Sequence, residues 1–262
     1  MRALSADLSV RALRVWQRNR DVYLVTWKTN LVPPLLEPIL YLLAFGAGVG
    51  TLVDEVPYRG ESLSYVAFIA PGLLATQVMF QAFFETTYNT FVRMYYQRTF
   101  DAIITTPLSI EDVMAGELLW GATKGTLGCA VMMLTISLFG LVSYPTALWI
   151  LPFSFVAALF FAAIGMCFTG VVPAIDAFNF PTFLFVIPMF LFSGTFFPVE
   201  VLPPWARWVA EALPLTHVCD VMREACLGRL PPSLLWDLLY LTAGAPPLAL
   251  LGIRLMKRRL VK

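Results

Sequence analysis

The sequence predicts an all-α integral membrane protein with six transmembrane helices in a single domain, 1–262. Hydrophobic residues make up 59% of the 262 residues and charged residues only 13%, whereas an ordinary soluble domain has about 45–50% apolar and about 25% charged residues. A transmembrane helix needs about 20 mostly apolar residues. Six segments meet that requirement: 31–53, 65–88, 118–142, 147–172, 177–197 and 234–255.

The N-terminal segment, 1–30, precedes the first span and has the pattern of an interfacial helix. Its apolar residues recur mostly at steps of three or four, while its arginines occupy other faces. An amphipathic helix of this kind lies in the membrane interface, with arginines beside anionic headgroups. It serves either as a membrane anchor or as a docking surface for a cytoplasmic partner, and membrane lipids are expected partners in both cases.

Positive charge is concentrated at the two ends of the chain. The N-terminal segment contains Arg2, Arg11, Arg14, Arg18, Arg20 and Lys28, and the C-terminal segment contains Arg254, Lys257, Arg258, Arg259 and Lys262. The cytoplasmic flanks of membrane spans carry the excess of lysine and arginine. Both termini are therefore expected in the cytoplasm, which requires an even number of spans.

Several polar residues fall inside the predicted spans. Gln77, Gln81 and Glu85 recur every four residues and share one face of the second span, which either packs against another helix or lines a watery pathway. Glu37, Glu85 and Lys124 lie at a similar depth near the cytoplasmic side. Because an unpaired charge in a bilayer is costly, we expect these three to pair inside the bundle; the alternative is that each snorkels to the headgroups.

The segment 89–117, between the second and third spans, combines charged and aromatic residues. A short helix is expected over 100–105, and Pro107 ends it because proline keeps the residue before it out of the α region. Ser109 then starts the next helix as its N-cap, with Asp112 in the first turn. The segment is thus an elbow of helix, proline break and helix, which either receives force from a soluble partner or merely connects two spans.

The segment 198–233, between the fifth and sixth spans, is rich in proline and tryptophan. Pro198 precedes a short helix in which Trp205 and Trp208 share a face, and Pro214 terminates that helix. Tryptophan is enriched where a membrane meets water. We therefore expect a pair of short interfacial or re-entrant helices on the outer side.

The sequence shows no motif for catalysis, metal binding or nucleotide binding. Its single histidine, His217, is expected to be a packing residue with one hydrogen bond, and Cys219 and Cys226 are too far apart on one helix to form a disulfide. No phosphate-binding loop occurs, since the residues around Lys124 have the wrong spacing. A net charge of +1 argues against nucleic-acid binding. We expect no catalytic residue, metal or cofactor in this chain.

Two stretches carry a specific pattern. One is the elbow, RTFDAIITTPLS at 98–109, and the other is LFSGTFFPVEVLPPW at 191–205, continued by PLTHV at 214–218. Together with the six spans and the N-terminal helix, they resemble the membrane permeases of ABC type-2 exporters over nearly the whole chain. Within that family the sequence is most similar to the permeases of nodulation-factor exporters, which move lipo-chitooligosaccharides.

The resemblance implies a permease homodimer that works with two copies of a separate cytoplasmic ATPase, which binds ATP and Mg. In the family, the elbow after the second span contacts the ATPase. That contact would comprise Arg98, Phe100, Asp101, Thr105, Thr106, Pro107 and Leu108, with a smaller one at 173–176. The first and fifth spans would meet near the dimer axis, at Gly46, Gly50, Phe183 and Phe190, the two glycines allowing close approach of helices.

The implied function is export of a lipid-linked or hydrophobic glycan across the bacterial inner membrane by a multi-pass permease that performs no covalent chemistry. Within the same family, the alternative cargo is a drug or another small hydrophobic molecule. Outside the family, a secondary transporter would be expected to show inverted repeats and midplane ion ligands. A membrane-embedded transferase would need a cluster of polar catalytic residues.

Overall fold

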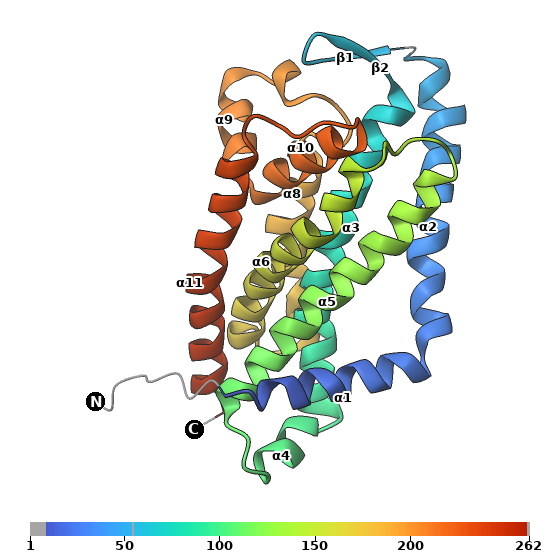
Figure 1. The fold of residues 1–262 in the computed structure, drawn as a ribbon. Coiled ribbons are helices and arrows are strands. Elements are labelled where there is room, and N and C mark those ends of the chain that lie inside the picture. Colours follow the sequence, from blue (N-terminus) through green and yellow to red (C-terminus); the bar gives the residue numbers. More distant parts are fainter. Residues whose placement is uncertain (1–8, 54, 261–262) are drawn as a thin grey trace.

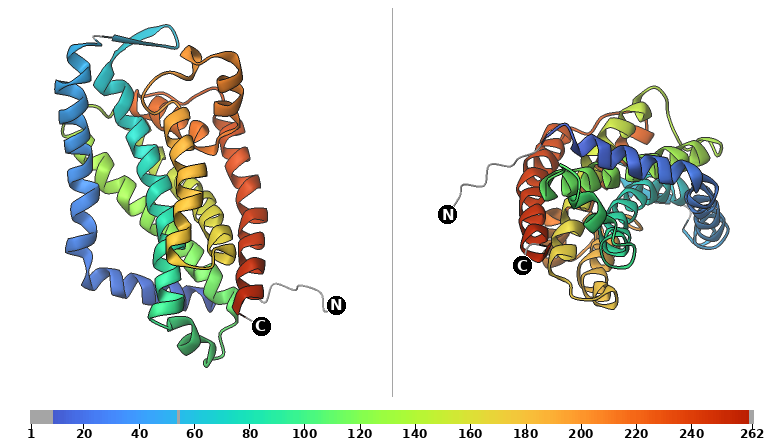
Figure 2. Two further views of the ribbon diagram at one scale, coloured as in Figure 1. Left: turned by 180° about the vertical axis from the view of Figure 1, so that it is seen from behind. Right: turned by 90° about the horizontal axis from the view of Figure 1, so that it is seen from below.

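The computed structural model of the chain describes residues 9–53 and 55–260. In that part of the chain, six helical stretches are long and apolar enough to cross a membrane: Trp27–Thr51, Tyr65–Tyr96, Ile110–Ser137, Thr146–Val171, Ile175–Phe192 and Leu234–Leu260. They form one bundle (Figures 1 and 2), which confirms the predicted fold class. We name its two ends the α4 end and the hairpin end, after α4 (Thr99–Ile104) and a β-hairpin that lie there.

The second and third spans reach further toward the α4 end than hydropathy predicts. The second continues to Tyr96 instead of ending at 88, and the third begins at Ile110 instead of at 118. Charged residues at these helix ends lower the local hydropathy although their charges are paired inside the bundle. The elbow is therefore shorter than the predicted 89–117 and lies between 97 and 109.

α1 (Ala12–Val25) runs across the α4 end, transverse to the spans, and the chain then turns into α2 (Trp27–Ala47), the first span (Figure 1). α1 contacts α5 and buries one face at helical spacing, formed by Ala12, Val15 and Asn19. The amphipathic helix predicted within 1–30 is thus present from Ala12 onward, whereas 1–8 lies outside the described residues.

A two-stranded antiparallel hairpin connects the first two spans, where the sequence predicted no secondary structure. Its strands are β1 (Glu55–Tyr58) and β2 (Glu61–Ser64). The turn residues Arg59 and Gly60 have φ values of 49° and 84°, and a positive φ at both central positions is typical of a type I′ turn. The ring of Tyr58 packs on that of Phe68 in the second span, with centroids 5.9 Å apart, and holds the hairpin over the bundle.

The second span changes its helical geometry before the elbow. α3 (Tyr65–Phe84) is followed by two π-helical segments, Glu85–Asn89 and Val92–Tyr96. Such wide turns are rare in proteins overall, and many of those that occur lie at functional sites. Arg98 then adopts a left-handed conformation with φ 48°, and α4 begins at the next residue.

α5 (Ile110–Ser137) begins with the capping residues that the sequence predicts. The Ser109 hydroxyl accepts a hydrogen bond from the Asp112 backbone N–H at 3.1 Å, and the Asp112 carboxylate accepts one from the Ser109 backbone N–H at 3.3 Å. This reciprocal pair is a capping box. The helix start predicted at Ser109 and the short helix before it, α4, are both confirmed.

The core lies where α3, α5 and α6 meet, and α11 packs against α6. Small residues allow this approach, since a Cβ at Gly125 of α5 would lie 2.8 Å from Ala158 of α6. The Thr86 hydroxyl adds an interhelical hydrogen bond to the Ala162 carbonyl at 2.9 Å. The remaining helices are α6 (Ile150–Val171), α7 (Asn179–Pro181), α8 (Ile187–Phe192), α9 (Pro204–Ala212), α10 (Pro214–Cys226) and α11 (Leu234–Leu260), with a π-helical segment at Thr182–Val186 and 3-10 turns at Val49–Thr51, Thr146–Trp149, Ile175–Phe178 and Val199–Val201.

α9 and α10 lie at the hairpin end (Figure 1), and their side chains differ in burial. α9 exposes Trp205 and Trp208, as an interfacial helix does, whereas α10 is buried over most of its length, as a re-entrant helix is. Pro214 does not simply terminate α9: it is the first residue of α10. That position favours proline because its missing N–H has no partner within the helix.

Gly116 of α5 lies so close to α1 that a methyl group has no room. A Cβ at Gly116 would lie 2.5 Å from Val15 Cβ and 2.7 Å from the Ala12 carbonyl oxygen, whereas a Cβ at Gly128 would lie 3.3 Å from the flexible Gln81 side chain. Overpacking costs about 1–3 kcal/mol, and alanine gains about 1 kcal/mol of helix propensity over glycine. We expect Gly116→Ala to lower the thermal unfolding midpoint of detergent-purified protein, and the control Gly128→Ala to leave it unchanged or raise it. Equal midpoints would contradict the α1–α5 packing.

Candidate functional site

The elbow is the outermost part of the α4 end (Figure 1). Most residues expected at a partner contact are exposed there: Arg98, Asp101, Thr105, Thr106 and Pro107, with Leu108 partly exposed. Phe100, expected at the same contact, is fully buried in the core. Its predicted role is therefore corrected, because the side chain anchors α4 and does not face a partner.

Two contacts fasten the elbow and the start of α5 to the N-terminal part of the chain. Arg11 Nη1, next to α1, donates a hydrogen bond to the Pro107 carbonyl oxygen at 2.5 Å. Asp112, besides capping α5, accepts a hydrogen bond from the Ser9 backbone N–H at 2.8 Å. The residues just before α1 are thereby joined to the elbow and to the first turn of α5.

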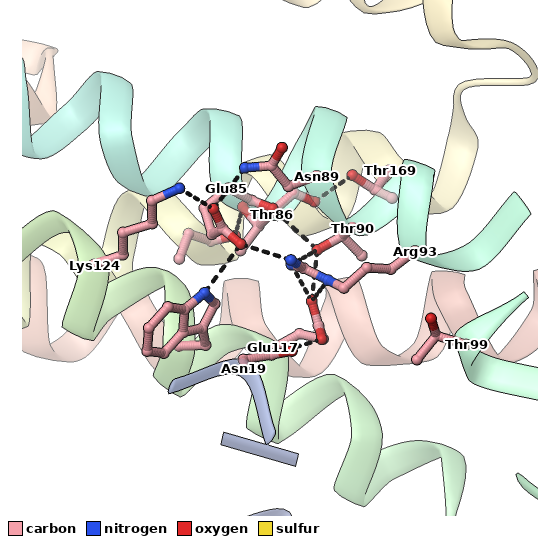
Figure 3. A network of polar contacts seen from close by, with 12 residues as sticks. Asn19, Glu85, Thr86, Asn89, Thr90, Arg93, Thr99, Glu117, Lys124 and Thr169 are labelled. Carbon is pink, nitrogen blue, oxygen red and sulfur yellow. Dashed lines mark hydrogen bonds and ion pairs between the residues drawn. The ribbon is translucent and has the colours of Figure 1, made fainter. Parts of the chain in front are cut away.

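Behind the elbow, a network of buried charges joins the second span to α5 (Figure 3). Glu85, which is 2% exposed, lies at its centre. The Glu85 carboxylate accepts hydrogen bonds from Lys124 Nζ at 2.7 Å and Asn89 Nδ2 at 2.6 Å. It also accepts one from Trp120 Nε1 at 3.1 Å and pairs with Arg93 Nη1 at 2.8 Å. Four donors therefore replace the water that this carboxylate would bind at a surface.

Glu117 is the second carboxylate of the network and is fully buried. Arg93 bridges the two glutamates, since its Nη2 and Nε also lie 2.5 Å and 3.0 Å from Glu117 Oε2. Thr90 Oγ1 and Asn19 Nδ2, the latter from α1, donate to Glu117 at 2.9 Å and 2.8 Å. The two glutamates balance Arg93 and Lys124, so the network is neutral. Pairing and full hydrogen bonding are the conditions under which buried charges are tolerated.

A cavity of about 170 Å³ opens beside the network, between α1, the second span and α5. Arg18 and Tyr23 of α1 form part of its wall. Burial lowers the pKa of the Arg18 guanidinium, an effect that Glu117 opposes and Arg93 reinforces, and burial raises the pKa of the Tyr23 phenol. Within 9–53 and 55–260, no group of three histidine, cysteine, aspartate or glutamate side chains could hold a metal ion.

Lys124 pairs with Glu85, as the sequence predicted, but Glu37 does not join them. Glu37 lies on α2 in an apolar groove beside Pro33 and Leu40, and it forms no ion pair with any described residue. The prediction of a cluster of three charges is therefore wrong for Glu37. The reason is that α2 stands at the edge of the bundle with most of its surface outward (Figure 2).

Gln77 and Gln81 pack against α5. A Cβ at Gly128 would lie 3.4 Å from Gln77 Nε2 and 3.3 Å from Gln81 Cγ, and Gln77 is buried. Of the two interpretations of this polar face, these contacts favour helix packing over the lining of a pathway.

The residues predicted near a dimer axis divide into two groups. Gly46 faces the second span, where a Cβ would lie 3.2 Å from a valine methyl group, and Gly50 lies in the 3-10 turn after α2. The ring of Phe190 packs on that of Phe196, with centroids 4.9 Å apart. These three residues contact their own chain, whereas Phe183 is 68% exposed.

Arg93 and Glu117 are central to the network but are not among the predicted site residues. Their signal is in the spacing: Arg93 follows Glu85 by eight residues, and Glu117 precedes Lys124 by seven. Each interval is about two helical turns, which places each pair on one face. Each face thus carries one negative and one positive residue. Two such faces at neighbouring ends of consecutive spans indicate a shared network.

Arg259 of α11 was also not predicted to have a role, and it closes the loop after the fourth span. Its Nη1 donates hydrogen bonds to the carbonyl oxygens of Thr169 and Val172, the latter at 2.5 Å. Its guanidinium lies over the Phe91 ring, 5.3 Å from the centroid. The segment 173–176 has no lysine or arginine of its own, so α11 supplies the positive charge there.

The proline and histidine residues singled out at the hairpin end are packing residues. Pro198 and Pro214 are buried. His217 Nδ1 forms a hydrogen bond with Asp237 Oδ1 at 2.7 Å, and its ring lies 4.5 Å from that of Tyr240. The packing role expected of His217 is confirmed. All four cysteines are free thiols.

Comparisons with a protein-family model and with individual proteins both give matches over most of the chain. A family model described as ABC-2 type transporter matches residues 12–227. The chain is 36% identical to Nodulation protein J of Rhizobium leguminosarum bv. viciae over 83% of this chain and 82% of that protein. It is 34% identical to Nodulation protein J of Sinorhizobium fredii over 95% and 94%, and 25% identical to the inner membrane transport permease YadH of Escherichia coli over 82% of each chain.

A double-mutant cycle tests the network. Contacting residues show interaction energies of about 0.5–3 kcal/mol in such cycles, whereas independent sites add within about 0.5 kcal/mol. We expect the unfolding free energies of Lys124→Met and Glu85→Gln, measured by reversible unfolding in mixed micelles, to be non-additive by about 1 kcal/mol or more. The control cycle, Lys124→Met with Glu37→Gln, should be additive. Additivity in the first cycle, or coupling in the second, would contradict the pairing.

Proposed function

The chain belongs to the ABC-2 type transporter family, and from this premise we propose that it exports a lipid-linked or hydrophobic glycan, of the lipooligosaccharide kind, out across the bacterial inner membrane. It is a transporter membrane subunit and not itself an enzyme; a separate ATPase subunit supplies the energy. The substrate class rests on the similarity to proteins named Nodulation protein J and on the resemblance to nodulation-factor exporters.

The observation that carries the proposal is the construction of the elbow. The elbow presents exposed polar residues on and beside α4, Phe100 anchors α4 in the core, and Arg11 is bonded to the Pro107 carbonyl. An ATPase that grips α4 would move a rigid lever and not a loose loop. The movement would pass through the left-handed turn at Arg98 into the π-helical segments and the charge network.

In this proposal the α4 end faces the cytoplasm. α1 and the end of α11 both lie there and carry most of the lysine and arginine of the two termini. A second permease copy would cover the exposed surface of α2 and Phe183. Two ATPase copies would bind the two elbows, with ATP and Mg held on those subunits.

Asp101 lies exposed on α4, and a charge reversal at this residue tests the docking of the ATPase. We expect the purified chain alone to hydrolyse no ATP. Asp101→Arg should lower ATP-dependent export by about tenfold or more, because reversing an interfacial charge opposes docking, while the thermal unfolding midpoint stays that of the wild type. Glu55→Arg, the same reversal at an exposed site of the hairpin end, is the control and should export normally. ATP turnover by the isolated chain, or normal export by Asp101→Arg, would contradict the proposal.

Cysteine labelling tests the orientation. Ser62 and Ala102 are exposed at opposite ends of the bundle. In intact cells whose outer membrane is permeabilised, we expect Ser62→Cys to react with an impermeant maleimide and Ala102→Cys to react only after the inner membrane is opened. The unmodified chain, three of whose four thiols are buried, gives the background. The reverse pattern would place the α4 end outside.

A further inference from the structure

A polar cavity of about 200 Å³ lies at the hairpin end, which is the opposite end of the bundle from the charge network. Its wall is formed by the end of β1 and by a continuous stretch of chain that comprises the loop after α8, α9 and α10. The polar wall residues are Tyr58, Ser193, Glu200, Arg207, Glu211, Thr216, Asp220 and Arg223. None of them belongs to the machinery described at the elbow.

Ser193 shows that the wall has unused hydrogen-bonding capacity. The residue is 0% exposed, and its hydroxyl has no hydrogen-bond partner in the described part of the chain. Burying a hydroxyl without a partner is unfavourable, and such groups are uncommon in folded proteins. A ligand in the cavity that hydrogen-bonds to this hydroxyl would remove the penalty.

Arg223 provides a fixed donor in the same wall. It is 2% exposed, and its Nε and Nη2 donate to the carbonyl oxygens of Phe68 and Gly194 at 3.1 Å and 2.6 Å. The guanidinium also lies 4.0 Å from the centroid of the Phe68 ring. No carboxylate among the described residues forms an ion pair with it. The structure thus holds a buried cation in place by carbonyls and a ring, at the edge of a cavity.

Carboxylates line the other parts of the wall. Asp220 is oriented by Arg59 at 2.9 Å and by the Tyr58 hydroxyl at 3.4 Å, whereas Glu211 is exposed and has no partner among the described residues. Carboxylates outnumber arginines in the wall by three to two, which disfavours an anionic ligand. A sugar hydroxyl both donates and accepts, so a ring bearing several of them matches alternating carboxylate, guanidinium and hydroxyl groups.

The volume of the cavity limits the size of the ligand that it can hold. Sites for drug-sized molecules usually enclose about 300–1,000 Å³, so about 200 Å³ suits one ring and not a whole lipid. We propose that this cavity binds one neutral sugar ring and receives the glycan of the exported molecule on the outer side. The inference rests on the proposed function and specifies where its substrate is held. The ring can belong to a lipid-linked glycan or to a free oligosaccharide.

The test uses the full chain with its ATPase in nanodiscs and chitotetraose as a soluble, neutral probe. Dissociation constants are measured by isothermal titration calorimetry. We expect Ser193→Ala and Glu211→Ala each to weaken probe binding by about fivefold to tenfold, as the loss of one hydrogen bond does. Because the Ser193 hydroxyl has no partner, the probe-free Ser193→Ala protein should unfold at the same temperature as the wild type or higher. Ser154→Ala, at a buried serine of α6 that is bonded to the Leu151 carbonyl, is the matched control and should bind normally.

A second arm presents the same tetrasaccharide on an acyl chain in vesicles. Binding of both forms, or of either form alone, supports the site, provided that the two variants weaken it. Binding of one form alone also identifies the source of the ring. Failure of the wild type to bind either form, or unchanged affinity in both variants, overturns the site.

Export of the acylated tetrasaccharide into proteoliposomes is measured separately. If the wild type exports it but neither variant changes binding, the cavity proposal is wrong and the proposed function stands. If the wild type binds the probe with the expected variant pattern but exports nothing, the proposed function is wrong and the binding site stands.

Discussion

Arg93 lies between Glu85 and Glu117, and the arrangement of the α4 end depends on that bridge. Removing an ion from water costs several kcal/mol, which is recovered only when partners of opposite charge and hydrogen bonds are already in place. One guanidinium can reach both glutamates only if the second span and α5 keep a fixed rotation about their axes. Asn19 reaches Glu117 only if α1 lies across the bundle end. The transverse position of α1 and the depth of the elbow therefore follow from the same pairing.

The close packing of the core supports this end. Glycines and alanines on α5 and α6 bring backbones close to the second span, and threonine hydroxyls bond across the gap to carbonyl oxygens. Lipid chains are as apolar as the side chains that they would replace, so such packing and hydrogen bonds hold membrane helices together. A movement that starts at α4 consequently meets a stiff core. The two π-helical segments lie between α4 and this core, and they are the part of the second span whose helical turns are already irregular.

The two ends of the bundle use charge differently. At the α4 end, positive and negative groups neutralise one another, and few of their hydrogen bonds remain unused. Ion pairs such as that of Arg59 with Asp220 also occur at the hairpin end, but around its cavity Arg223 is held by carbonyls, Ser193 has an unused hydroxyl and Glu211 faces the solvent. A closed network stabilises a structural joint, whereas free donors and acceptors around a cavity suit a ligand that arrives and leaves.

The sequence by itself determined the membrane class, the six spans, the amphipathic α1 and the capping box at Ser109, because hydropathy and helix capping act over a few neighbouring residues. It also placed α4 and its exposed residues within a residue or two. Only the tertiary structure decided that Lys124 pairs with Glu85 and not Glu37, that Phe100 points inward, and that Arg93 and Glu117 complete the network. These outcomes depend on which helix faces meet, and the rotation of one helix against another is fixed by packing between residues far apart in the chain.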